Sequence, residues 1–205
     1  MDNWNCPTCG APLEVEHRFV QMVTCDFCSN VALLRDNHLE ATGREAALID
    51  MPTKLFLEAT GTIAGRGFRT LGRLQYQFED GVWQEWYLLF DDGGRGWLVE
   101  DGGTFTLYDK ETVTADLPAP EHVRVGSTVQ VDAFTVFVTE KGHATIAGGE
   151  GQLGFALIPG ETIQYVDGTA NGLQVTIEYS ADEVEFMAGQ ELPADAIEVT
   201  DPYGA

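Results

Sequence analysis

Apolar and polar residues alternate with a period of two along much of the chain beyond its first quarter. The segment LQYQF at 74–78 puts one leucine and two aromatic residues on one face and two glutamines on the other. Turn segments rich in Asp and Gly, at 79–81, 91–96 and 101–103, interrupt this pattern at short intervals. Because short alternating segments separated in this way are typical of antiparallel strands joined by tight turns, the region predicts a β-sheet.

The same alternation returns nearer the C-terminus. The segment 173–179 alternates strictly, and 127–146 has the pattern of a hairpin whose phase slips at 132–133, which predicts a turn or a bulge. This hairpin resembles an earlier segment at an offset of 66 residues (128 minus 62). The matched residues are Thr62, Ile63 and Phe68 in the first copy and Thr128, Val129 and Phe134 in the second. We therefore consider two related β-modules, with chance similarity as the alternative.

Four cysteines form two Cys-x2-Cys pairs, Cys6 with Cys9 and Cys25 with Cys28. Each pair lies in a turn, CPTCG or CDFCS, and Gly10 is suited to the positive φ that follows the first. Two such turns can place four thiolates around one tetrahedral metal ion, so the spacing predicts a zinc ribbon. Four thiolates leave no open position on the metal, so one zinc ion per chain is expected to be structural.

Two other interpretations of the cysteines are less consistent with the sequence. The N-terminus has no basic and apolar signal region, and no apolar run approaches the roughly 20 residues of a membrane span. We therefore expect a cytoplasmic protein without membrane insertion, in which cysteines stay reduced instead of forming disulfides. A redox-active pair would need a neighbouring βαβ pattern, which is not visible. A unit of about 35 residues is not expected to fold without its metal, whereas the β-modules are expected to survive its loss.

Together these patterns predict an all-β fold: an N-terminal zinc ribbon followed by two small antiparallel β-barrel or rolled-sheet modules. The predicted parts are the ribbon at 1–35, a linker at 36–54, a first module at 55–118 and a second, strongly acidic module at 119–205. Within the linker, the segment REAALID has the composition of a short helix, and Pro52 would separate it from the first module.

The segment WQEWYLLF at 83–90 has two interpretations. Strand alternation places Trp83, Glu85 and Tyr87 on one face. On the first interpretation, the aromatic residues of this strand are simply core, as large apolar side chains usually are. The residues expected there are Trp86, Leu88 and Phe90 on the opposite face. On the second, Trp83, Glu85 and Tyr87, with Trp97 nearby, form an exposed patch that holds a cationic group by cation–π contact and a carboxylate.

Glycine and aromatic positions in the middle of the chain carry a family resemblance. The matching positions are Gly72, Tyr76, Trp83, Glu85, Trp86, Tyr87, Trp97, Leu98 and Gly102. With these motifs and a CPxCG ribbon ahead of them, the chain resembles bacterial members of the domain-of-unknown-function family 4178. The resemblance implies an accessory or assembly role beside polyamine-synthase-like enzymes, small membrane proteins and coiled-coil proteins of the phage-shock type. It identifies no reaction.

The composition adds a strong negative charge to this picture. The 205 residues carry a formal net charge of -22, which argues against nucleic acid as a partner because phosphate binding needs Lys and Arg. Residues 119–205 hold 14 acidic and two basic residues, a net charge of -12. We therefore expect the second module to bind a basic protein or another polycation through complementary charge.

No catalytic pattern is visible in the sequence. HExxH, P-loop, dinucleotide-binding and Gly-x-Ser-x-Gly motifs are lacking, and the four histidines are scattered. We predict a non-enzymatic zinc-ribbon adaptor for a basic protein or assembly partner, in a bacterial accessory system linked to polyamines or membrane stress. The alternative is a module that binds a small amine or polyamine and serves a partner enzyme.

Overall fold

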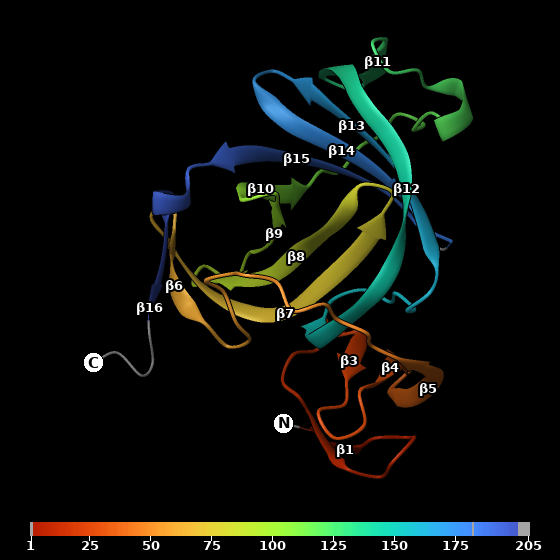
Figure 1. Ribbon diagram of the computed structural model, residues 1–205, viewed down its shortest axis with the longest axis vertical. Coiled ribbons are helices and arrows are strands. Elements are labelled where there is room, and N and C mark those ends of the chain that lie inside the picture. The colour runs from red at the N-terminus through yellow and green to blue at the C-terminus, as the bar shows by residue number, and fades with distance from the viewer. Residues whose placement is uncertain (1, 182, 201–205) are drawn as a thin grey trace.

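The computed structural model describes residues 2–181 and 183–200, and Figure 1 shows a nearly all-β chain. The predicted fold class is therefore confirmed. The N-terminal strands are β1 (Asp2–Asn5), β2 (Pro12–Val15), β3 (Met22–Thr24), β4 (Asn30–Arg35) and β5 (His38–Glu45). A first series follows as β6 (Thr60–Ile63), β7 (Arg66–Phe78), β8 (Gly81–Phe90), β9 (Arg95–Asp101) and β10 (Thr104–Lys110). A second series comprises β11 (Thr128–Val131), β12 (Phe134–Leu153), β13 (Thr162–Ala170), β14 (Leu173–Tyr179) and β15 (Val184–Leu192). The remaining elements are β16 (Ile197–Thr200) and two 3-10 turns, η1 (Pro120–His122) and η2 (Ala194–Ala196).

Eight of these strands form a sheet that closes on itself, in the order β7-β8-β9-β10-β15-β14-β13-β12 and back to β7 (Figure 1). All neighbouring pairs are antiparallel. The ladders β10–β15 and β7–β12 join strands far apart in the sequence. The segments 55–118 and 119–205, predicted as two separate modules, therefore supply the two halves of one closed sheet. Each four-stranded half alone would present two unpaired edges, and mutual pairing satisfies their backbone groups.

The two halves share one topology. Each begins with a short strand in a hairpin with the next strand, β6 with β7 and β11 with β12, and continues as a meander of long strands. Both hairpin turns use a residue with positive φ, Ala64 at 49° and Asp132 at 45°. The predicted phase slip at 132–133 is this turn. The two turns are 68 residues apart (132 minus 64), so the sequence similarity at an offset of 66 residues does not bring the two hairpins into register.

An apolar cluster lies on the outer face of the first half. Trp86 and Leu88 of β8 form its centre, and Leu55 packs onto them from the segment 46–58, which crosses the sheet there. This is the core position that strand alternation predicted. Burial of these side chains stabilises the fold by roughly 25 cal/mol for each Å² of apolar surface that is removed from water.

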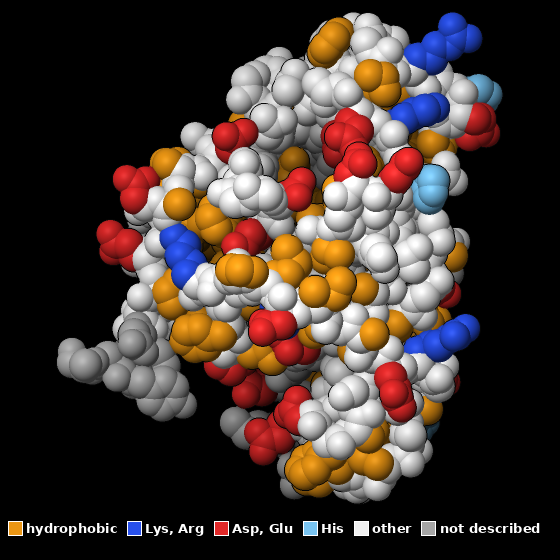
Figure 2. All heavy atoms as spheres, in the orientation of Figure 1, with side chains coloured by type: hydrophobic (Ala, Val, Ile, Leu, Met, Phe, Trp, Pro, Cys, Tyr) orange, Lys and Arg blue, Asp and Glu red, His pale blue; other side chains and the backbone are white. Residues whose placement is uncertain are grey.

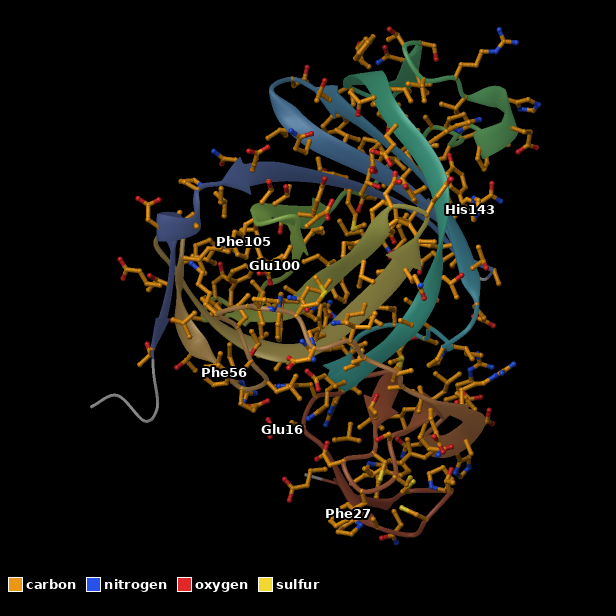
Figure 3. The ribbon with its side chains drawn as sticks, viewed as in Figure 1. Glu16, Phe27, Phe56, Glu100, Phe105 and His143 are labelled. Atoms are coloured by element: carbon orange, nitrogen blue, oxygen red, sulfur yellow. The ribbon has the colours of Figure 1, made fainter. Side chains whose placement is uncertain are left out.

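The same covering segment is fixed to the sheet by a buried polar group. Oε2 of Glu100 (labelled in Figure 3) accepts hydrogen bonds from Thr53 Oγ1 at 2.8 Å, Gln84 Nε2 at 2.8 Å and Trp86 Nε1 at 3.2 Å. A buried carboxylate is stable where several donors replace its hydration. Glu100 therefore acts as an anchor between the covering segment and strands β8 and β9.

The outer face of the second half has its own apolar cluster. Val138 of β12, Ile177 of β14 and Phe186 of β15 pack with Val123, which lies in the connection 111–127 between the halves. Each half thus buries its outer face beneath a connecting segment. The inner face of the closed sheet is formed by the residues that alternate with these along the same strands.

The N-terminal ribbon is continuous with the closed sheet. Strand β3 pairs with the end of β12, with Met22 opposite Leu153. Met22, Val31 and Leu33 belong to the same apolar cluster as Leu71 of β7. The ribbon and the closed sheet therefore share a core as well as a ladder.

The short helix predicted within 36–54 is wrong, because this segment contains strand β5, which pairs with β4. The N–H of Ala46 donates to the carbonyl of Ser29 at 2.9 Å, and the N–H of Ala47 donates to that of Ala147 at 3.2 Å. The backbone at 46–47 is thus bonded to neighbouring segments of the chain. In the part of the chain that the structure describes, no helix has the length and apolar character needed to cross a bilayer.

Candidate functional site

Two equivalent turns position the four cysteines. The N–H of Gly10 donates to the carbonyl of Cys6 at 2.9 Å, and the N–H of Ser29 donates to that of Cys25 at 2.8 Å. Gly10 takes a φ of 78°, as the sequence predicted, and Ser29 takes 56° at the corresponding place. At the tip of the second turn, the side chain of Phe27 is 73% exposed (Figure 3). Each turn thus points its two sulfur atoms toward the other.

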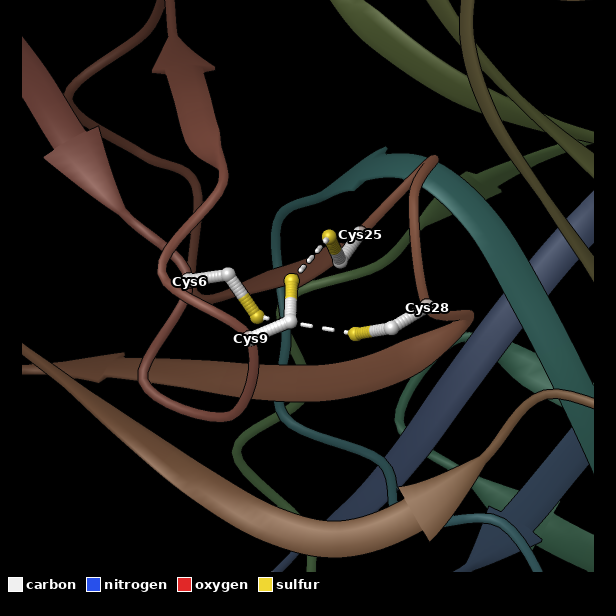
Figure 4. A group of neighbouring side chains, drawn as sticks. All are labelled: Cys6, Cys9, Cys25 and Cys28. Atoms are coloured by element: carbon white, nitrogen blue, oxygen red, sulfur yellow. Dashed lines mark hydrogen bonds between the residues drawn. The ribbon is translucent and has the colours of Figure 1, made fainter.

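The four sulfur atoms converge on one point between the turns (Figure 4). Cys6 Sγ lies 3.8 Å from Cys28 Sγ, Cys9 Sγ lies 3.8 Å from Cys25 Sγ, and all four lie within 4.8 Å of one another. A tetrahedral ion bound to four sulfur atoms at about 2.3 Å separates them by about 3.8 Å. The cluster predicted from the spacing therefore has the geometry of a metal site.

The structure brings Trp83, Glu85, Tyr87 and Trp97 together on the inner face of the closed sheet. The second interpretation, in which they form an exposed surface patch, is wrong about the exposure. Glu85 is 4% exposed and Tyr87 is 5% exposed, and the two tryptophans are half-buried. The alternation of 83–90 was read correctly, but the closing of the sheet turns this face inward.

Two cavities occupy the inside of the closed sheet. The larger, here called the large chamber, has a volume of about 360 Å³ and is bordered by Trp97 and Glu185. The smaller, the small chamber, has about 130 Å³ and is bordered by Trp83 and Asp167. Glu85 and Glu178 line both chambers. Of the two chambers, only the large one has the volume of a typical small-molecule site.

Acidic residues of the second half face Glu85 across the chambers. Asp167 of β13, Glu178 of β14 and Glu185 of β15 line them, and sequence reasoning missed all three. A signal was present, since the apolar residues of 173–179 leave Glu178 on the opposite, polar face of the strand. On the face shown in Figure 2, acidic side chains lie beside hydrophobic ones, with few Lys or Arg among them.

The surroundings of Glu85, Asp167 and Glu178 in the chambers raise the pKa of these three carboxyl groups. Burial, together with the charges of Glu185 and Asp167, raises the pKa of Glu85 to about 7. Burial raises the pKa of Asp167 to about 6 and that of Glu178 well above its ordinary value. Within residues 2–181 and 183–200, no ion pair involves Glu85, Asp167 or Glu178.

Glu85 and Glu100 are two buried carboxylates in different situations. Glu100 accepts three hydrogen bonds at one oxygen, whereas Glu85 accepts a single bond, from Trp83 Nε1 at 2.9 Å. Glu100 lies under a covering segment, and Glu85 borders open space. Glu85 therefore retains the capacity to accept further donors from a molecule in the chambers.

Aromatic rings form much of the chamber walls. Trp83 stacks on Tyr76 at a centroid distance of 4.9 Å and meets Tyr165, from the opposite half, edge-on at 5.6 Å. Near the large chamber, the ring centroid of Trp97 lies 4.6 Å from that of Tyr87 and 4.8 Å from that of Phe155. Aromatic faces beside carboxylates attract organic cations.

The carboxylates of the chambers do not converge on one point. Among the described residues, the cysteine cluster is the only group of three or more His, Cys, Asp or Glu side chains that could hold a metal ion. The negative charges inside the closed sheet are instead spread over both chambers.

The family described as "Domain of unknown function (DUF4178)" matches residues 57–194, which is 138 of the 205 residues. This span contains every strand of the closed sheet and leaves the cysteine cluster outside. No curated protein and no solved structure matches the chain.

Proposed function

This chain belongs to the DUF4178 family, whose description assigns no activity, and we propose that its closed sheet binds a small organic amine in the ammonium form. The observation that carries the proposal is Glu85, a buried carboxylate that borders two chambers and has no cationic partner among residues 2–181 and 183–200. Burial of an unpaired carboxylate costs several kcal/mol, and a bound ammonium group would offset that cost.

The distribution of charge favours an elongated ligand over a compact ion. Acidic groups occur in both chambers, and Glu85 and Glu178 border the two. Because these groups do not gather around a single point, they suit a chain with several separated charges better than one metal ion. A linear polyamine has this chemistry, and its alkyl segments would lie against Trp83 and Trp97.

Calorimetric titration with spermidine at pH 8 tests the proposal. We expect binding by the wild-type protein and at least a tenfold loss of affinity in Glu85→Gln, since hydrogen bonds to charged groups contribute about 1.5–3 kcal/mol. Glu198→Gln removes the same charge from an exposed position on β16 and should bind like the wild type. Equal losses in the two variants would contradict the proposal.

The metal of the cysteine cluster is proposed to be one structural Zn²⁺ per chain. Four thiolates at the observed spacing support this assignment, because zinc accepts a closed tetrahedral sphere of sulfur ligands. We expect elemental analysis of purified protein to give one zinc per chain and Cys25→Ser to lower that ratio sharply. Protein that is folded and free of zinc would refute the assignment.

The basic partner expected from the charge of 119–205 stays a prediction, as does the absence of catalysis. Five of the 14 acidic residues in that segment line the chambers, so we assign them to amine binding and not to the surface that would contact a basic protein. They are Glu140, Asp167, Glu178, Glu183 and Glu185. A module that binds an amine for a partner enzyme is compatible with a basic protein partner and with the absence of catalysis in this chain.

A further inference from the structure

Lys110 places a primary ammonium group at the edge of the large chamber. It is the last residue of β10 and follows Thr106 and Tyr108 at two-residue intervals, so it shares the inner face of that strand. Its Nζ lies 2.5 Å from one carboxylate oxygen of Glu183 and 2.5 Å from one of Glu185. The chain thus already holds, at this place, the chemical group that the chambers are proposed to bind.

This ion pair lies between the large chamber and an outer hollow through which a ligand would enter. An outer hollow, here called the vestibule, is lined by Lys110 and adjoins the large chamber. The two spaces share Trp97, Phe155, Glu183 and Glu185 as lining residues. An amine that passes from the vestibule into the large chamber meets the two carboxylates that Lys110 occupies.

We infer that Lys110 is a built-in competitor of the ligand, whose ammonium group must leave Glu183 and Glu185 before an amine can use them. This inference rests on the proposed amine binding. Displacement is feasible because the side chains of Lys110 and Glu183 are each 52% exposed, and exposed ion pairs are weak. The side chain has an alternative place in solvent once the carboxylates are taken.

The charge state of Lys110 supports this role. Burial acts to lower the pKa of Lys110, but its bonds to Glu183 and Glu185 outweigh that effect and raise the pKa above its ordinary value. The side chain is therefore an ammonium ion at every pH at which an aliphatic amine ligand is one, so the two compete as like charges.

A comparison of spermidine affinity in Lys110→Gln and wild-type protein tests the inference. If the ion pair is closed in about nine of ten molecules, its removal tightens apparent affinity about tenfold, because only the open fraction is competent to bind. Arg44→Gln is the matched control, since it removes one positive charge from an exposed position on strand β5, outside the closed sheet. The gain should vanish in the Glu183→Gln/Glu185→Gln background, where Lys110 has nothing to occupy.

The outcomes separate the two proposals. The role of Lys110 is overturned if Lys110→Gln leaves the affinity for spermidine unchanged or lowers it. It is also overturned if the gain in affinity persists without the two glutamates, or if Arg44→Gln gives an equal gain. Each of these results leaves amine binding in place. If neither the wild type nor folded Lys110→Gln binds spermidine, the amine proposal itself fails. Binding by Lys110→Gln alone supports both.

Discussion

Replacement of Cys9 by serine is expected to unfold the ribbon and also to lower the thermal stability of the closed sheet. The ribbon has a small core of its own, so its folding depends on metal binding, which contributes about 10–16 kcal/mol in small zinc domains. Sequence reasoning alone expected the β-modules to survive this loss. The structure changes that expectation, because Met22 and Leu33 of the ribbon belong to the same apolar cluster as Leu71 of the closed sheet.

The size of the second effect follows from the shared core. Loss of the ribbon would expose apolar surface of the closed sheet, at a cost of about 1.5–3 kcal/mol for each large side chain that loses its burial. Thermal unfolding followed by tryptophan fluorescence reports mainly on the closed sheet, because three of the four tryptophans, Trp83, Trp86 and Trp97, lie in it and the fourth, Trp4, lies in the ribbon. Thr8→Ala, a change in the same turn at a residue that is not a metal ligand, is the control and should leave the transition in place. A Cys9→Ser protein with the wild-type transition would show that the two parts are energetically independent.

The metal ligands could be predicted from sequence because their geometry is local. Each pair of cysteines is held by a turn of five residues, and the pattern of that turn is readable in CPTCG and CDFCS. The alternation of 83–90 was readable for the same reason, since side chains on a strand alternate whatever the strand pairs with. Both predictions depended on residues that are neighbours in the chain.

The inside of the closed sheet could not be predicted in this way. Glu85 meets Asp167 and Glu178 only because β7 pairs with β12 and β10 pairs with β15, and these ladders join segments more than 60 residues apart. Alternation shows that a strand has two faces, but it does not show which face turns inward. The apolar faces of 83–90 and 173–179 lie on the outside beneath the segments 46–58 and 111–127, whereas the apolar face of 74–78 turns inward, where Tyr76 and Phe78 line the chambers.

The second large effect is a gain of stability at pH 8 in Glu85→Gln. The pKa of Glu85 is about 7 in the folded protein against an ordinary value of 4.5, so the folded state holds a proton that the unfolded state has already lost. Stability therefore falls as pH rises from about 4.5 to 7 and stays low above that range. At about 1.4 kcal/mol per pKa unit, the shift corresponds to a cost of about 3 kcal/mol at pH 8.

Glutamine removes this cost because it is neutral and its oxygen can still accept the hydrogen bond from Trp83. Urea unfolding at pH 5 and pH 8 should show the variant and the wild type close together at pH 5, with the variant more stable at pH 8. Glu100→Gln is the matched buried control and should lose stability at both values, because its carboxylate accepts three hydrogen bonds. A variant less stable than wild type at pH 8 would instead make Glu85 a structural anchor like Glu100. A carboxylate whose removal stabilises the protein and weakens amine binding is one that the fold retains for its ligand.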